Sequence, residues 1–248
     1  MHSVPSSPAC RDSSHTLFCR CRRATPNPKH VQGRSSPATL SHYEQLAAVV
    51  TSVAPSDGID YHDSSNCVAM DCEMVGVGPS GQLSVLARVS IVDWHGAVLM
   101  DTFVQVQERV VDYRTHVSGI RAEDLTGDKA LEFGTVRTLV QNVLRGKLLV
   151  GHGLVNDLKV FHLNHPWHMI RDSATYQPLL RFNLQPRRLK ELARVELGLL
   201  IQPDGKEHDS VEDARAAMEI YKRHQAGWDY DVRSMVPLEQ TQGMYALH

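Results

Sequence analysis

Long apolar runs and an excess of charge of one sign are both missing from this 248-residue sequence. No run approaches the roughly 18 apolar residues that a bilayer-spanning helix needs, so we expect a soluble protein with no membrane partner. The 26 lysine and arginine residues are offset by 28 acidic residues, which gives a net charge of −2. A chain with no global positive field can attract a polyanion only through a local basic patch or bound cations.

Cysteines are few and odd in number, at positions Cys10, Cys19, Cys21, Cys67 and Cys72. No secretory signal precedes them, so we expect no disulfide framework, and a reducing compartment fits best. The first three cysteines lie near His15 and His30, which leaves zinc binding as an alternative. Their spacing matches no standard zinc finger.

Composition divides the chain into three regions. Residues 1–65 are basic and rich in Ser and Pro, which predicts a mostly disordered extension. Within it, Ser41 and Glu44 form a capping-box pair that predicts a short helix near 41–52. Residues 66–226 carry the patterns of a folded domain, and 227–248 form a C-terminal tail. The basic extension is also compatible with a mitochondrial transit peptide, a nuclear-import signal or a non-specific RNA contact.

Apolar spacing within 66–226 predicts a meander followed by alternating helices and strands. Strands are expected over 67–74, 84–91 and 98–106, joined by short turns. Helices are expected over 133–144, 156–163, 187–197 and 211–224, with short strands over 147–150 and 168–171. This order predicts an α/β domain, in which helices flank a mixed sheet.

Three acidic segments are candidates for chemistry. Asp71 and Glu73 are two residues apart on a strand, so both point to one face, where a divalent cation would relieve their repulsion. Asp157 opens a helix after a buried strand, the edge of a sheet where ligands collect. His208 and Asp213 flank the start of the last helix. The alternative for each segment is structural: a solvated strand end, or residues that cap helices, with Ser210 as the N-cap of the last one.

Taken together, these segments resemble the DEDDh 3′→5′ exonucleases, most of all the group of RNA exonuclease 4 and the interferon-stimulated exonucleases. The similar stretches are MDCEMVG at 70–76, GH and ND at 151–152 and 156–157, IRDS at 170–173 and SVEDA at 210–214. YRTHVSGI at 113–120 is also similar. The resemblance covers about residues 66–226.

The resemblance implies a ribonuclease H-like fold and a site built from this set of residues: Asp71, Glu73, Asp157 and Asp213 as metal-binding acids and His208 as the catalytic histidine. The terminal nucleotide would contact Met74, His116, Ser118, Gly119 and Ile120. Some relatives have Arg in place of His116, which bears on the preference for RNA over DNA.

The implied activity is release of nucleoside 5′-monophosphates from 3′ ends of single-stranded RNA, with two Mg²⁺ ions that Mn²⁺ can replace. The implied role is ribosomal RNA processing in the nucleus, in particular the nucleolus; mitochondrial and cytoplasmic locations stay open. The alternatives are a DNA 3′→5′ exonuclease and a catalytically silent nucleic-acid-binding module.

Two further features carry predictions of their own. Asp172 is expected to support the structure through hydrogen bonds rather than to act in the cleft. A local basic patch, formed by Arg181, Arg187, Arg188, Lys190 and Arg194, is either a surface for the RNA backbone or a solvated helix face.

Overall fold

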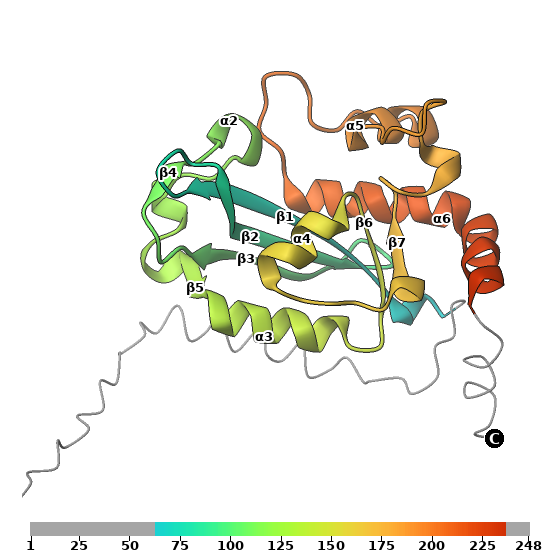
Figure 1. The fold of residues 1–248 in the computed structure, drawn as a ribbon, viewed down its shortest axis with the longest axis horizontal. Coiled ribbons are helices and arrows are strands. Elements are labelled where there is room, and N and C mark those ends of the chain that lie inside the picture. Colours follow the sequence, from blue (N-terminus) through green and yellow to red (C-terminus); the bar gives the residue numbers. More distant parts are fainter. Residues whose placement is uncertain (1–62, 237–248) are drawn as a thin grey trace, which may run out of the picture. The chain divides into compact units, whose positions relative to one another are not determined.

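The computed structural model describes residues 63–236 (Figure 1). A seven-stranded sheet runs in the order β5–β3–β2–β1–β6–β7, and β4 pairs with β1. The helix predicted over 41–52 and the first three cysteines lie outside the described residues. Within the described residues, every helix is too short or too polar to cross a bilayer.

The meander consists of β1 (Cys67–Val77), β2 (Leu83–Asp93) and β3 (Val98–Gln105), in which β2 pairs antiparallel with both β1 and β3. The pairing of β1 with β2 shifts by one residue between Glu73 and Met74, which marks a β-bulge. β4 (Val110–Asp112) continues this side of the sheet by pairing with the end of β1. The bulge therefore lies directly beside the two candidate carboxylates, where such irregularities often reorient side chains.

The second half of the sheet is parallel. β5 (Ala130–Glu132) pairs with β3, β6 (Leu148–Gly151) pairs with β1, and β7 (Ile170–Asp172) pairs with β6. α3 (Phe133–Leu144) and α4 (Leu154–Phe161) connect these strands. The predicted mixed sheet with flanking helices is confirmed.

Alternation along the central strands creates two cores. On β1, Cys67 and Ala69 face the core covered by α6, whereas Val68 and Met70 face the core covered by α3 and α4. Figure 1 shows these helices distributed around the sheet. Continuing the same alternation places Asp71 on the α6 side and Cys72 on the α4 side.

Short segments complete the domain. They are η1 (Ser64–Asn66), α2 (Thr115–Ser118), η2 (Ala122–Asp124), η3 (Gly127–Lys129), η4 (Trp167–Met169), η5 (Gln177–Leu179) and α5 (Leu189–Leu192), which runs into the π-helical turn η6 (Ala193–Leu197).

The last helix, α6 (Ser210–Met235), continues well past the predicted end at residue 224. Trp228 packs into the core, and Asp229 forms a fully buried ion pair with Arg171 of β7, at 2.8 Å. The folded part therefore extends beyond residue 226, where the sequence placed the end of the domain. The sequence pattern did not predict this extension, because an isolated acid such as Asp229 interrupts the apolar spacing of the helix. Its buried partner is 58 residues away in the sequence.

Candidate active site

The two carboxylates of β1 lie side by side at the bulge. Glu73 is 6% exposed and Asp71 is partly buried. Opposite Glu73 on β2 lies Arg88, whose guanidinium pairs with Asp101 at 2.8 Å and with Asp209 at 3.4 Å. Because Arg88 already has two other acidic partners, it only partly offsets the negative charge of the strand.

α4 brings Asp157 to the same edge of the sheet. The turn before the helix is tight: a Cβ on Gly151 would lie 2.4 Å from the Leu154 side chain and 2.9 Å from the Met70 carbonyl oxygen. Asp172 accepts hydrogen bonds from the backbone N–H groups of Gly153, at 2.7 Å, and Leu154, at 2.9 Å. These bonds fix the N-terminus of α4, so Asp172 has the supporting role that the sequence predicted.

Asp157 has a neighbour that the sequence did not reveal. It is 5% exposed and forms a hydrogen bond with the thiol of Cys72, which follows Asp71 on β1. Burial, followed by the charges of Asp157 and Asp71, raises the pKa of Cys72 well above its usual value, so the thiol keeps its proton. Cys72 therefore acts as a donor that helps to position the Asp157 carboxylate.

The start of α6 brings in Asp213, but the predicted cap is wrong by one residue. The N-cap is Asp209, whose carboxylate accepts from the Val211 N–H at 3.1 Å, and Ser210 is the first residue of the helix. Ser210 is fully buried, so its hydroxyl joins the core side of the helix instead of capping it. Asp213 is 3% exposed, and Gln202 donates a hydrogen bond to its Oδ2.

His208 lies on the loop that precedes α6. Its backbone N–H donates to the Val117 carbonyl oxygen at 2.7 Å, and Glu207 pairs with Arg121 at 2.6 Å. Close approach of this loop to Gly119, which has a φ of 68°, favours glycine there. Burial, assisted by the positive charge of Lys190, lowers the pKa of His208 and so favours the neutral imidazole, which can accept a proton.

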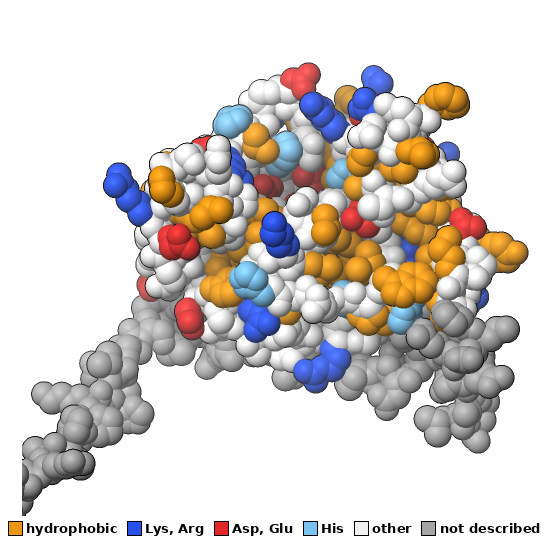
Figure 2. Space-filling view, viewed as in Figure 1, with side chains coloured by type: hydrophobic (Ala, Val, Ile, Leu, Met, Phe, Trp, Pro, Cys, Tyr) orange, Lys and Arg blue, Asp and Glu red, His pale blue; other side chains and the backbone are white. Residues whose placement is uncertain are grey.

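All five predicted catalytic residues meet in one region. Candidate ligand atoms of Glu73, His208 and Asp213 lie within 4.8 Å of one another. Asp71 lines the same hollow as these three, and it also lines a neighbouring groove together with Asp157. In Figure 2, acidic side chains lie deep in a hollow, with histidines close by.

Burial dominates the electrostatics of the four carboxyls. It raises the pKa of Glu73 to about 8, with a further contribution from Asp213. It raises the pKa of Asp157 and of Asp213 to about 7. The pKa of Asp71 lies well above its usual range because of burial and then the charges of Asp157, Asp213 and Glu73. Such shifts in one cleft are typical of functional sites.

This environment fits a divalent cation. The Oδ1 atom of Asp213 is buried and has no hydrogen-bond partner among the described residues. Several crowded carboxylates are costly unless a cation compensates them, and oxygen ligands suit Mg²⁺ and Mn²⁺. The acidic group formed by Glu73, Asp213 and the adjoining acids can therefore hold divalent metal.

The residues predicted to contact the terminal nucleotide differ from one another in whether their side chains are available for binding. Met74 lines the groove next to Asp71, and His116 is exposed on α2. The Ser118 hydroxyl is buried and donates to the Tyr113 carbonyl oxygen at 2.9 Å, whereas the Ile120 side chain packs in a small core cluster. The side chains of Ser118 and Ile120 are thus committed to the fold.

Beside the acids, Val117 of α2 and members of the basic patch line the hollow. Arg188 and Lys190 both contribute to its wall. Lys190 pairs with Asp204 at 2.8 Å, and Arg181 pairs with Glu191 at 2.6 Å. Two cations of the patch are thus partly neutralised by acids of the same face.

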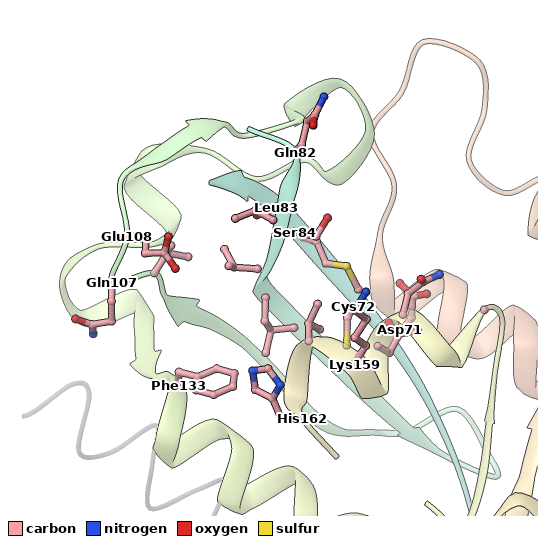
Figure 3. A pocket seen from close by; sticks show the side chains of 18 of the residues that line it. Asp71, Cys72, Gln82, Leu83, Ser84, Gln107, Glu108, Phe133, Lys159 and His162 are labelled. Carbon is pink, nitrogen blue, oxygen red and sulfur yellow. The ribbon is translucent and has the colours of Figure 1, made fainter. Parts of the chain in front are cut away.

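A groove of about 710 Å³ adjoins the acids on the α4 side. Figure 3 shows Asp71 and Cys72 on one side of it, with Phe133 and His162 lying next to each other elsewhere on its wall. The sequence did not reveal this groove, because its wall combines β2, the loop after β3, the start of α3 and one face of α4.

A family model described as Exonuclease, RNase T, matches residues 68–221, which include all five catalytic candidates. The chain belongs to the RNase T exonuclease family. RNA exonuclease 4 of Mycosarcoma maydis is 51% identical over 174 residues, which are 69% of this chain and 46% of that protein. Human RNA exonuclease 4 is 44% identical over 176 residues, 70% of this chain and 40% of that protein. The chain thus spans less than half the length of these RNase T relatives.

Solved structures agree with this assignment. The Saccharomyces cerevisiae Pan2 pseudoubiquitin hydrolase–RNA exonuclease module in complex with AACCAA RNA is 28% identical, with a TM-score of 0.60 over 79% of this chain and 34% of that one. The same module in complex with AAUUAA RNA is 27% identical, with a TM-score of 0.58 over 78% of this chain and 36% of that one. The predicted family and ribonuclease H-like fold are confirmed.

Proposed function

We propose that this RNase T family member is a metal-dependent 3′→5′ exoribonuclease that releases nucleoside 5′-monophosphates from single-stranded RNA. One observation carries the proposal: four acids and a histidine from three distant segments gather where two adjoining hollows meet at Asp71. A catalytically silent module would be expected to lack one of the five, and all are present.

Asp71, Glu73, Asp157 and Asp213 would hold two Mg²⁺ ions, and Mn²⁺ should substitute because its ligand preferences are similar. Bound ions would acidify a water molecule and stabilise the charge that develops on the phosphate and the departing oxygen. Four carboxylates carry −4, which two divalent ions balance. As the carboxyls of the metal-free cleft ionise with rising pH they should repel RNA, so binding of RNA should depend on metal, most strongly at alkaline pH.

His208 is the candidate general base. Its imidazole lies at the edge of the hollow, 32% exposed, 3.8 Å from Asp213. It would take a proton from the attacking water as a new phosphorus–oxygen bond forms and the bond to the preceding 3′ oxygen breaks. The products are a nucleoside 5′-monophosphate and a strand shortened by one nucleotide. Met74, His116 and the backbone of Ser118, Gly119 and Ile120 would position the terminal nucleotide.

RNA is the substrate favoured by similarity. The relatives above are named RNA exonuclease 4, and the Pan2 module was solved with RNA oligomers. As the family resemblance of the sequence motifs implies, we further propose a role in ribosomal RNA processing in the nucleus, in particular the nucleolus. A DNA exonuclease would use the same five residues, so degradation of a matched single-stranded DNA oligomer in parallel decides between the two substrates.

The decisive experiment follows a 5′-labelled RNA oligomer through incubation with the wild type and Asp71→Asn, with Mg²⁺ and with EDTA. We expect a ladder that shortens from the 3′ end only for the wild type with Mg²⁺. Glu123→Gln, which removes one exposed acid outside the site, is the matched control and should retain activity. Equal activity of Asp71→Asn and the wild type would refute the proposal.

A further inference from the structure

The acids lie where two hollows meet, and the two hollows are chemically different. His208, Glu73 and Asp213 line one of them, together with Arg188 and Lys190. Asp157 lines the other, the groove beside α4, which His208 does not reach. The proposed base and Asp157 therefore line different hollows, and Asp71 lines both.

The geometry of phosphodiester hydrolysis indicates which part of the RNA strand lies in which hollow. The attacking water and the departing 3′ oxygen lie on opposite sides of the phosphorus, roughly in line. Water that is deprotonated by His208 attacks from the His208 side, so the departing oxygen points toward Asp157 and the groove. That oxygen belongs to the nucleotide before the terminal one. We propose that the groove binds the strand upstream of the scissile bond, as unpaired nucleotides; this rests on the proposed function.

The wall of the groove suits bases better than a phosphate backbone. Away from Asp71 its surface is mostly neutral, from apolar side chains and amides: Leu83, Val85, Val106, Val160, Gln82, Gln107 and Asn156. Bases that are unstacked from a helix bind to such surfaces through their faces and edges. A paired base presents neither, so the groove should favour single strands.

Phe133 and His162 provide a stacking surface. The Phe133 ring lies 6.4 Å from that of Phe161 at an interplanar angle of 21°, which holds it in place. His162 ends α4 in the left-handed region with a φ of 51°. Arg137 donates to the carbonyl oxygens of Phe161, at 2.9 Å, and His162, at 3.2 Å. Both rings are thus carried by a backbone that is already fixed, which lowers the entropic cost of binding.

Lys159 supplies positive charge to the groove. It is exposed on α4, one turn before His162, and forms no ion pair with any described residue. Glu108 is an acid on the far wall. A single lysine can pair with only one phosphate of the RNA. We therefore expect base stacking to contribute more to RNA binding than this charge does.

Photo-crosslinking tests the direction of the strand. Oligomers would carry 5-iodouridine at the first, second or third nucleotide from the 3′ end and be bound to the full chain with Ca²⁺ in place of Mg²⁺. We expect crosslinked peptides containing Phe133 or His162 from the second and third positions. Crosslinks to these peptides from the first position alone, or from none, would overturn the proposal.

A length series provides the functional readout. For the wild type, kcat/KM should rise from a dinucleotide to a hexamer as the groove fills. Phe133→Leu, which keeps apolar bulk against Phe161, and His162→Asn, which suits a positive φ, should each lower kcat/KM for the hexamer roughly fivefold and for the dinucleotide less than about twofold. Lys159→Gln should reduce the slope of log KM against log salt by about 0.7.

Arg145→Gln is the matched control for charge, because Arg145 lies at the far end of α3 from Phe133. It should match the wild type at every length. Equal losses on dinucleotide and hexamer, or none, in the folded groove variants would refute the groove assignment while leaving the exonuclease proposal intact. A wild type that cleaves neither substrate would instead refute the proposed function.

Discussion

The hydroxyl oxygens of Ser90 and Ser210 lie 2.7 Å apart, although 120 residues separate them in the sequence. Ser90 donates its single proton to Asp101 at 2.9 Å, so Ser210 must be the donor between the two serines. Asp101 in turn binds Arg88, the cation opposite Glu73. This chain of contacts ties the first residue of α6 to β2 and thereby sets the position of Asp213, one turn further along.

Removing both of these serines should cost less than the sum of the costs of removing each one. Ser90→Ala leaves the buried Ser210 hydroxyl without its acceptor, which should lower the free energy of unfolding by about 1–3 kcal/mol. The double variant Ser90→Ala and Ser210→Ala removes donor and acceptor together, so its loss should be smaller than the sum of the single losses. Urea unfolding of the four proteins measures the coupling, and strict additivity would show that the bond contributes nothing of its own.

Asp172 should be essential for the geometry of α4. Besides the two bonds to the start of α4, it accepts from the Ala174 N–H at 2.9 Å. Asp172→Asn places an amide donor against these N–H groups, so we expect a loss of about 1–3 kcal/mol of stability and reduced exonuclease activity.

Asp231→Asn, which changes a partly buried acid of α6 outside the cleft, serves as the comparison for Asp172. Thermal melts and kcat, measured for both variants, show whether Asp172 acts through the structure of α4 or in the chemistry. If Asp172→Asn lost activity with an unchanged melting temperature and unchanged metal affinity, Asp172 would act in the chemistry rather than through α4.

The buried pair of Arg171 and Asp229 should make the C-terminal half of α6 part of the domain. Asp229→Ala removes the carboxylate that pairs with the fully buried guanidinium of Arg171 and should cost about 3–5 kcal/mol. Tyr221 also donates to Asp229, at 3.0 Å, so its hydroxyl loses its acceptor too. Chemical denaturation of the variant gives the value directly.

Truncation tests the same boundary without a point substitution. A chain ending at residue 226 lacks Trp228 and Asp229 and should not fold cooperatively, whereas one ending at residue 236 should keep the melting temperature of the full chain. Cooperative unfolding of the shorter chain at the same temperature would show that the domain ends where the sequence pattern first suggested.

Sequence patterns succeeded where the information is local. The positions of Asp71 and Glu73 follow from alternation on one strand, and the bounds of α3 match the predicted 133–144. Motif order then identified the catalytic candidates before any contact among them was known.

The sequence-based predictions failed where a contact between residues far apart in the sequence determines the local structure. β4 and β5 have three residues each and exist only because β1 and β3 pair with them. Ser210 looked like an N-cap because serine favours that position, but its contact with Ser90 places it inside the helix. The thiol of Cys72 forms a hydrogen bond with Asp157 of α4, and no motif marks such a pair.

The raised carboxyl pKa values predict an unusual dependence of stability on pH. In the metal-free protein, the pKa of Glu73 rises from 4.5 to about 8 and that of Asp213 from 3.8 to about 7. Between these limits the folded state binds protons that the unfolded chain has released, so stability from these groups is present at low pH and is lost as pH rises toward 8. His152 and His165, whose pKa values burial lowers, act in the opposite sense.

Metal should reverse this trend, because it binds the ionised carboxylates. We expect the rise in melting temperature on replacing EDTA with Mg²⁺ to be small at pH 5.5 and large at pH 8. Glu73→Gln isolates the contribution of the Glu73 carboxyl, because the variant lacks this titrating group. In EDTA, the melting temperature of the variant should fall less between pH 5.5 and pH 8 than that of the wild type. The two histidines remain in the variant, so their contribution cancels in the comparison. An identical pH dependence in both proteins would mean that Glu73 is already ionised without metal, and that its burial is compensated by Arg88.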